Sequence, residues 1–413
     1  MTMTAKRRRA HAKLAALPGV RPIRRPIVPG RPGEFDLYYV RSGLKSAHPL
    51  VIIPGGPGMA SVAAYRGLRR HAAAAGLDVI MVEHRGVGLS RHDDAGADLP
   101  PEAITVEAVV DDIAAVLDDA GVGSAIIYGT SYGTYLAAGF GARHPHRVAQ
   151  LVLDSPLLSA GDIDYMRAAI RGLLLDGADP QAADLAPKVR KLFDDGVFTD
   201  SAGQLAGALY GYGGTSLLGR QIDLLSSGRT WVWSALHLLR RVPRHAAPFR
   251  HEEDLVNRIA FRELNFAGVP DGLPLDPSIG ITEQNPDRQP FEHEPFDLTA
   301  EMPRFTWPTV VVSGGHDLVT PPAVARRVAD LIPGAVLVEL PNAGHSLLDT
   351  REQAALAIVA AVRAGAADIL PDRVAELDAL PTKIALRLAM SALTAATMAE
   401  SAVPRWGGGV RTS

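Results

Sequence analysis

The chain has 413 residues, of which 47% are hydrophobic, and its 42 Lys+Arg against 45 Asp+Glu give a net charge of −3. This composition excludes a disordered chain and lacks the basic excess of a nucleic-acid-binding protein. The absence of cysteine excludes disulfides, thiolate metal sites and a cysteine nucleophile. Any covalent chemistry must therefore use another side chain.

The N-terminal residues 1–34 are rich in arginine and begin with the basic run 6–9. The apolar stretch that follows is broken at Pro18-Gly19, so it is too short for a signal peptide. No segment approaches the ~20 apolar residues of a membrane helix. We interpret 1–34 as a mobile basic tail on a cytoplasmic protein without stable membrane insertion. The alternative is a polybasic anchor to acidic lipid or RNA.

Short Val-, Ile- and Leu-rich runs alternate with helix-length segments, which predicts a mostly parallel sheet covered on both faces. The expected strands are Leu50–Ile53, Val79–Val82, Ala125–Tyr128, Leu151–Leu153, Thr309–Ser313 and Val336–Leu340. The expected helices are 62–75, 105–120, 134–144, 322–331 and 353–364. The fold class is α/β, doubly wound, with a core formed by residues 35–158 and 305–365.

The alternation of expected strands and helices stops in residues 159–304. Gly-rich segments (Gly207, Gly211, Gly213, Gly214) and Pro-rich loops replace it there. A block that interrupts a parallel sheet in this way predicts an inserted, mainly helical cap or lid. Residues 366–413 form an extension in which 383–399 permit a helix. That helix has three open roles: packing on the core, covering the site, or contacting a second copy.

Gly129-Thr130-Ser131-Tyr132-Gly133 lies directly between an expected strand and an expected helix. This G-x-S-x-G pattern in a strand-turn-helix setting predicts a serine nucleophile on a tight turn. The following helix also points its N-terminal amides toward the site. We therefore expect Ser131 to be the nucleophile; an incidental serine in a Gly-rich turn is the alternative.

A serine hydroxyl needs an adjacent base, and the base needs an acceptor that fixes its tautomer. His345 and Asp317 both follow the carboxyl ends of expected strands, where open α/β sheets build their sites. We expect His345 to be the general base and then acid, and Asp317 its orienting carboxylate. Asp154 also ends a strand and is the competing acid. His84 and His316 are expected to shape loops.

Acyl transfer also requires donors that face the developing oxyanion. The run Pro54-Gly55-Gly56-Pro57-Gly58 follows an expected strand, and its glycines let a backbone amide face the site. We pair the amide of Gly56 with that of Tyr132. The histidine-containing runs 144–146 and 292–294 lack zinc spacing, so we predict no metal and no cofactor.

Together these segments resemble the α/β-hydrolase superfamily, and within it the proline iminopeptidase and tripeptidyl-aminopeptidase-like serine peptidases. The Ser-Asp-His chain order is also that of α/β-hydrolases. Pro54, Glu83-His84 and Tyr132 differ from the iminopeptidase pattern, so the resemblance implies hydrolysis more firmly than proline specificity. The resemblance covers residues 35–158 and 305–365 and rests on 55–58, 83–90, 129–134, 314–322 and Gly344-His345.

Membership would imply removal of N-terminal residues from peptides, with acidic cap residues receiving the substrate's ammonium group. The candidate substrate-binding residues are Glu263, which lies in a segment similar to the family's cap, together with Glu252, Glu253 and Glu283. Solvation of cap helices is the alternative role for each of them.

The expected function is a serine hydrolase that works through an acyl-enzyme, most simply an aminopeptidase. The expected partner is a short peptide or small molecule, and the sequence does not fix the oligomeric state. An esterase or thioesterase of small-molecule esters keeps the same mechanism. A non-catalytic binding protein on the same fold is the third alternative, because fold alone does not guarantee activity.

Overall fold

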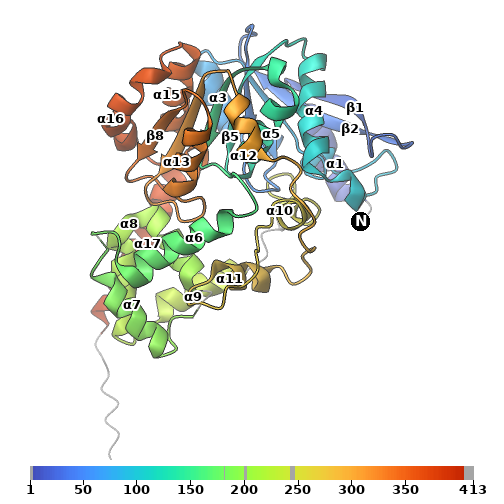
Figure 1. The fold of residues 1–413 in the computed structure, drawn as a ribbon. Coiled ribbons are helices and arrows are strands. Elements are labelled where there is room, and N and C mark those ends of the chain that lie inside the picture. Colours follow the sequence, from blue (N-terminus) through green and yellow to red (C-terminus); the bar gives the residue numbers. More distant parts are fainter. Residues whose placement is uncertain (1–2, 181, 200–201, 242–246, 404–413) are drawn as a thin grey trace, which may run out of the picture.

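The computed structural model describes residues 3–180, 182–199, 202–241 and 247–403. Eight strands form one sheet with the order β1-β2-β4-β3-β5-β6-β7-β8 (Figure 1). β2 is antiparallel to both β1 and β4, and every other pair is parallel. The strands are β1 Val20–Pro26, β2 Glu34–Ser42, β3 Leu50–Ile53, β4 Val79–Val82, β5 Ala125–Thr130, β6 Val148–Asp154, β7 Thr309–Gly314 and β8 Val336–Leu340.

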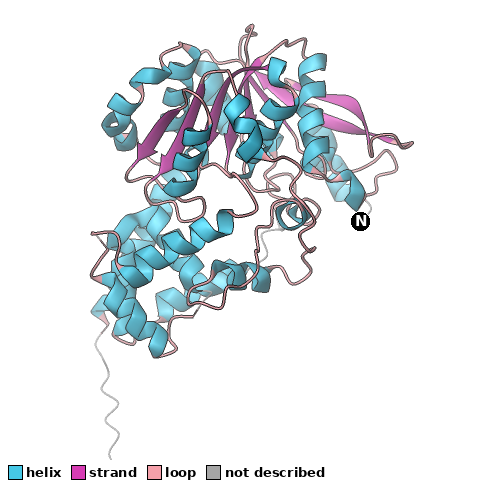
Figure 2. Cartoon of the chain, viewed as in Figure 1, coloured by secondary structure: helices cyan, strands magenta, loops and turns pink. Residues whose placement is uncertain are grey.

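Helices cover both faces of this sheet, which confirms the predicted α/β class (Figure 2). One apolar cluster joins the sheet to α4, α5, α12 and α13, and a second joins it to α1, α3, α15 and α16. The helices around the sheet are α1 Ala5–Ala15, α2 Ser61–Ala64, α3 Arg66–Ala74, α4 Val106–Asp119, α5 Tyr132–Arg143, α12 Leu298–Glu301, α13 Pro322–Leu331, α14 Leu347–Thr350, α15 Glu352–Arg363 and α16 Val374–Ala379.

A separate layer of helices lies on one side of the sheet, between β6 and β7 in the sequence (Figure 1). We call α6 to α11 the inserted helices; α6 to α9 share an apolar cluster of their own, whereas α10 contributes Ile259 to a cluster of the sheet and joins α11 in a small separate cluster. The inserted helices are α6 Asp162–Arg171, α7 Leu185–Asp194, α8 Ala202–Ser226, α9 Trp231–Arg241, α10 Asn257–Arg262 and α11 Pro277–Gln284, with a π-helical turn at Gly172–Asp176.

The C-terminal helix α17, Ile384–Ala402, packs against the inserted helices α8 and α9. Glu400 accepts hydrogen bonds from the amides of Trp231 and Val232, at 2.8 and 3.1 Å, and so caps the start of α9. In the described ranges, no helix has both the length and the apolar character needed to cross a bilayer.

The six expected strands are present, but the structure differs from the expectation of a mobile tail in residues 1–34. Residues 5–15 form α1, and residues 20–26 form the edge strand β1. We missed β1 because Pro22, Pro26 and the arginines between them hide the strand pattern. Proline and positive charge are typical of an edge strand, which has one unpaired side.

A buried ion pair ties the edge strand β1 to the core. Asp112 on α4 is 1% exposed and accepts two hydrogen bonds from Arg85, at 2.7 and 2.8 Å. Arg25 on β1 donates a third, at 2.8 Å. The Arg85 guanidinium is itself 1% exposed, so Asp112 neutralises a charge that has no access to water.

Asp112→Ala should therefore lower the free energy of unfolding by about 3–5 kcal/mol, because it leaves a buried arginine charge without its partner. Urea denaturation followed by circular dichroism measures this change. Asp118→Ala on the same helix is the matched control, because Asp118 is 69% exposed where it pairs with Arg147. Asp118→Ala should lower the free energy of unfolding by less than about 1 kcal/mol. Equal decreases for the two variants would contradict the role given to Asp112.

Candidate active site

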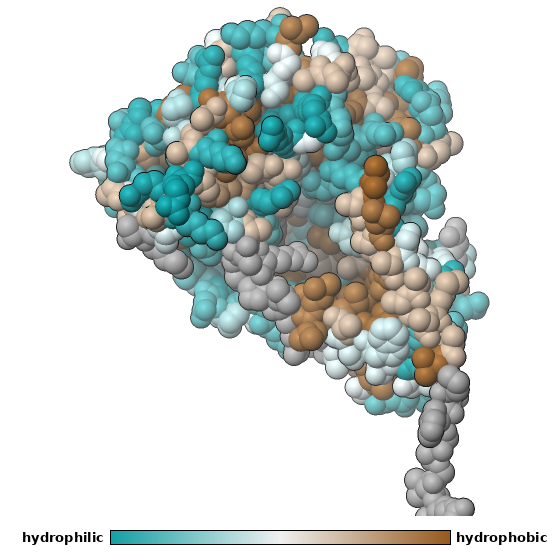
Figure 3. Space-filling model, turned by 180° about the vertical axis from the view of Figure 1, so that it is seen from behind, coloured by the Kyte–Doolittle hydropathy of each residue, from teal (hydrophilic) through white to brown (hydrophobic). Residues whose placement is uncertain are grey.

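A cavity of about 1300 Å³ lies between the carboxyl ends of the parallel strands and the inserted helices. Its wall includes residues that follow β3, β5, β7 and β8, as well as residues of α6, α10 and α11. Seen from behind, the surface is hollowed between the sheet and the inserted helices (Figure 3). The cavity therefore lies at the sheet edge where α/β proteins bind ligands.

The turn between β5 and α5 places Ser131 at the cavity wall. Ser131 has a φ of 52°, a conformation that non-glycine residues rarely adopt. A Cβ on Gly129 would lie 2.3 Å from the Gly133 carbonyl oxygen, and one on Gly133 would lie 2.1 Å from the oxygen of Ile53. Both glycines are thus required for the turn to pack against β3, and this packing presents the serine to the cavity.

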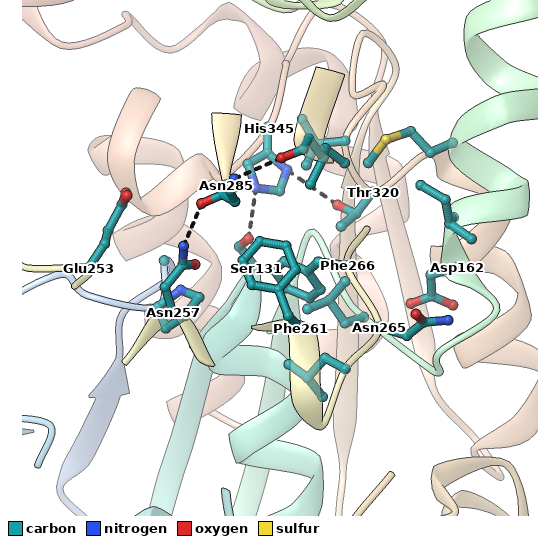
Figure 4. A pocket seen from close by; sticks show the side chains of 18 of the residues that line it. Ser131, Asp162, Glu253, Asn257, Phe261, Asn265, Phe266, Asn285, Thr320 and His345 are labelled. Atoms are coloured by element: carbon teal, nitrogen blue, oxygen red, sulfur yellow. Dashed lines mark hydrogen bonds between the residues drawn. The ribbon is translucent and has the colours of Figure 1, made fainter. Parts of the chain in front are cut away.

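The three residues predicted to act together are brought together, and Figure 4 shows two of them, Ser131 and His345. The Nε2 atom of His345 lies 2.8 Å from the Oγ atom of Ser131, and its Nδ1 atom lies 2.9 Å from Asp317 Oδ2. Asp317 is fully buried and accepts further hydrogen bonds from the amides of Val319 and Thr320 and from the Thr320 hydroxyl. The carboxylate is therefore fixed, and it fixes the imidazole in turn.

The charges of Asp317 and His345 support each other. Burial alone would raise the pKa of Asp317, but His345 and the hydrogen bonds from Thr320 bring it below its ordinary value. Burial alone would lower the pKa of His345, but Asp317 outweighs burial and raises it. An imidazole held in this way is suited to accepting a proton from a neighbouring hydroxyl.

Asp154, the competing acid, does not contact the histidine ring; it joins the two loops instead. Its Oδ2 atom accepts hydrogen bonds from the hydroxyls of Tyr128 and Thr130, at 2.9 and 3.0 Å. The amides of Leu347 and Leu348 also donate to this carboxylate, at 3.1 and 3.0 Å. Asp154 thus links the strand before Ser131 to the helix after His345.

The Gly-rich loop after β3 lies against Ser131, as predicted from its position. A Cβ on Gly55 would lie 3.1 Å from the Cβ of Ser131, and Gly56 lines the cavity. Tyr132, whose amide is the other predicted oxyanion donor, begins α5. Its hydroxyl lies 3.1 Å from His84 Nε2, so His84 supports this tyrosine as a loop-shaping residue.

The structure turns two of the four predicted substrate-binding glutamates away from the cavity. Glu263 is 4% exposed; it accepts a hydrogen bond from the Val106 amide at 2.8 Å and pairs with Arg262. Glu252 is 3% exposed and pairs with Arg7. Both carboxylates already have hydrogen-bond and arginine partners inside the protein. The prediction that Glu263 and Glu252 bind substrate is therefore wrong.

Glu253 and Glu283 do line the cavity, together with carboxylates that the sequence did not single out. Asp162 is the clearest of these, because its Oδ1 atom is buried without a hydrogen-bond partner. Burial raises the pKa of Asp162 from 3.8 to about 7. In Figure 4, Asp162 and Asn265 lie on one side of the Ser131–His345 pair and Glu253 lies on the other.

Two further histidines considered from the sequence, His144 and His316, have neighbours that account for their positions. His144 contacts Asp111 at 3.0 Å on the surface, and His316 packs against the ring of Tyr210. Across the described part of the chain, no three potential metal-ligating side chains gather as a metal ion would require.

Comparison with known proteins identifies related sequences along most of the chain. Residues 48–196 match the α/β hydrolase fold family, and residues 288–363 match the family described as TAP-like protein. The rhodomycin D methylesterase DauP of Streptomyces sp. (strain C5) is 30% identical over 336 residues, which cover 80% of this chain and 96% of that protein.

Two further relatives bear the name of a peptidase. The proline iminopeptidase of Neisseria gonorrhoeae is 26% identical over 81% of this chain and 93% of its own length. The crystal structure of a Mycobacterium smegmatis proline iminopeptidase has a TM-score of 0.51 and 17% identity, and it covers 84% of this chain and 99% of that one. The fold, the matched segments and the 30% identical relative show that the chain belongs to the α/β-hydrolase family.

Proposed function

We propose that the protein is a serine hydrolase in which Ser131 forms an acyl-enzyme. One observation carries the proposal: the Nε2 atom of His345 lies 2.8 Å from the serine hydroxyl, while Nδ1 lies 2.9 Å from a fully buried Asp317 carboxylate. This is the arrangement needed to activate a serine near neutral pH. The family relationship adds independent support for hydrolysis.

The reaction follows from the positions of these groups. His345 Nε2 takes the hydroxyl proton while Ser131 Oγ attacks the substrate carbonyl, and the carbonyl oxygen becomes an oxyanion near the amides of Gly56 and Tyr132. The imidazolium returns the proton to the leaving group as the scissile bond breaks. Water then attacks the acyl-serine ester by the same proton transfers, which releases the acid and regenerates the hydroxyl.

The charge of the cavity wall favours a substrate with a free amino group. Asp162, Glu253, Glu283 and Asp349 line the cavity, whereas no lysine or arginine does so within the described ranges. An ammonium group buried there would find a counter-charge, and an anionic substrate would not. The first candidate is therefore an aminopeptidase that releases N-terminal residues, with the inserted helices acting as its lid.

An esterase is the second candidate, and two observations favour it. The 30% identical relative is named a methylesterase. Glu263 and Glu252, the residues that the peptidase resemblance first suggested, are occupied by Arg262 and Arg7. A small-molecule ester needs the same serine chemistry but does not need the cavity carboxylates.

The chemistry is tested by Ser131→Ala and Asp317→Asn with aminoacyl arylamides and with p-nitrophenyl esters. Ser131→Ala should abolish turnover and leave the circular dichroism spectrum unchanged. Asp317→Asn should lower kcat by about 10⁴-fold, because the imidazole loses its orienting acceptor. It should also shift the acid limb of kcat/KM to lower pH, since Asp317 raises the pKa of His345. Undiminished turnover by Ser131→Ala would refute the assignment.

The choice between an aminopeptidase and an esterase is tested by comparing free and N-acetylated versions of one aminoacyl arylamide. For a peptidase, Glu283→Gln should raise KM for the free amine and leave the acetylated substrate unchanged, because only the cation uses the carboxylate. Asp287→Asn is the matched control, because Asp287 is an exposed carboxylate three residues after α11 that does not line the cavity. Equal rates for the two substrates would favour the esterase.

The ionisation of Asp162 can be measured through stability. Its folded pKa of about 7 is raised above the ordinary 3.8, so the folded state holds a proton that the unfolded chain releases between about pH 4 and 7. Stability is therefore lost as pH rises through that window. Relative to wild type, Asp162→Asn should gain at least about 1 kcal/mol between pH 5 and 8, since one pKa unit is worth about 1.4 kcal/mol.

Urea denaturation at both pH values measures the gain of Asp162→Asn. Asp164→Asn is the control, because Asp164 lies on the same helix with a side chain that is 75% exposed. Parallel pH profiles for Asp162→Asn and wild type would show that Asp162 is ionised as usual.

A further inference from the structure

Arg7 of the N-terminal helix α1 forms a buried ion pair with the body of the protein, beside the apolar contacts of Ala10 and Leu14. The Arg7 guanidinium donates to both carboxylate oxygens of Glu252, at 2.6 and 2.9 Å, and to the Gly88 carbonyl at 3.1 Å. It also lies over the Phe249 ring, 4.5 Å from the centroid. A bidentate pair of this kind, with Glu252 3% exposed, is far stronger than a surface contact.

Glu252 uses its remaining capacity to hold the backbone around it. It accepts hydrogen bonds from the amides of Phe249, at 2.8 Å, and Gly88, at 3.0 Å. Phe249 has a φ of 62°, which is unfavourable for a residue that carries a Cβ. This conformation persists only where its surroundings impose it. Burial alone would raise the pKa of Glu252, but the Arg7 pair brings it below the ordinary value.

The segment that contains Glu252 pairs with the Gly-rich loop beside Ser131. The Glu252 amide donates to the Gly58 carbonyl at 2.9 Å, and the Ala60 amide donates to the Arg250 carbonyl at 3.0 Å. A Cβ on Gly58 would lie only 2.9 Å from the Glu252 carbonyl oxygen, so the two segments are in direct backbone contact. The same loop touches Ser131 at Gly55 and lines the cavity at Gly56.

We propose that Arg7 and Glu252 are positioning residues, which hold the loop 55–60 against Ser131 from outside the cavity. This inference rests on the proposed function, because it assigns the loop to the oxyanion. The basic N-terminus then serves the reaction by fixing a distant carboxylate, and neither a lipid nor an RNA is required to explain Arg7. A displaced loop would weaken an interaction made mainly in the transition state, so its loss should appear in kcat.

The test compares Arg7→Ala, Arg7→Lys and Arg9→Ala in the full chain, below the lowest melting temperature of the set. Arg9 is an exposed arginine of the same helix and is the matched control. Arg7→Ala should lower kcat for a p-nitrophenyl ester about tenfold, a fraction of the loss caused by removing an oxyanion donor. KM should change less than about twofold. Arg7→Lys should restore part of kcat, because lysine keeps the charge and loses the bidentate geometry.

The rate at which a fluorophosphonate labels Ser131 gives a second readout, with Ser131→Ala as the unlabelled reference. Slower labelling of Arg7→Ala, with normal labelling of Arg9→Ala, supports the proposal. A lower melting temperature with unchanged kcat and labelling would overturn it, because Arg7 would then be structural only. If wild type itself takes no label at Ser131, the proposed function fails, and the positioning role fails with it.

Discussion

The arrangement around Ser131 depends on one buried carboxylate that is not itself proposed to react. Asp154 ends β6 and is wholly enclosed, and its acceptor sites receive hydroxyls from β5 and amides from the start of α14. Those two elements adjoin Ser131 and His345, respectively. Without a shared acceptor, each loop would have buried donors to satisfy independently, and the 2.8 Å contact between hydroxyl and imidazole would not be imposed.

Three serines in an uncommon backbone conformation lie in the loops that meet near Asp154. Ser131, Ser155 and Ser346 all have positive φ, at 52°, 55° and 60°. They are linked, because the Ser131 amide donates to the Asp154 carbonyl and the Ser346 amide donates to the Ser155 hydroxyl. Ser131 and Ser155 directly follow β5 and β6, and Ser346 precedes α14; strain of this kind persists where hydrogen bonds over-determine the chain, which is typical of functional sites. Here it turns three neighbouring loops toward the same cavity.

Local patterns in the sequence were sufficient for the six parallel strands and for the three side chains of the candidate site, but neither β1 nor β2 was among the expected strands. The strand-turn-helix context located Ser131, and the strand ends located Asp317 and His345, because parallel strands bring their carboxyl ends to one edge. β1 escaped prediction because an edge strand tolerates proline and charge. Asp162 escaped because nothing in its local sequence distinguishes an aspartate whose Oδ1 atom is buried without a partner from an ordinary aspartate at a helix N-terminus.

The glutamates show a second limit of prediction from the sequence, because their roles are set by partners far along the chain. Glu252 pairs with Arg7 across 245 positions, and Glu263 caps α4 through Val106 across 157. Glu283, by contrast, lines the cavity from the last turn of α11. A carboxylate in a sequence carries no sign of whether an arginine or a substrate will neutralise it. Resemblance alone therefore assigned Glu263 to the substrate, and its buried contacts removed it.

The walls of the cavity are held by segments outside the two family matches, which cover residues 48–196 and 288–363. On one side, α8 meets the His345 loop so closely that a Cβ on Gly344 would lie 2.2 Å from the Gly211 oxygen, and α17 packs behind α8. On the other side, residues 250–252 pair with the Gly-rich loop, and α1 is attached behind them through Arg7. Two of the four cavity carboxylates, Glu253 and Glu283, also lie outside the matches, whereas Asp162 and Asp349 lie within them. The motif that contains Ser131 therefore does not fix the charge of the cavity, because part of that charge comes from residues 197–287, which the family matches do not include.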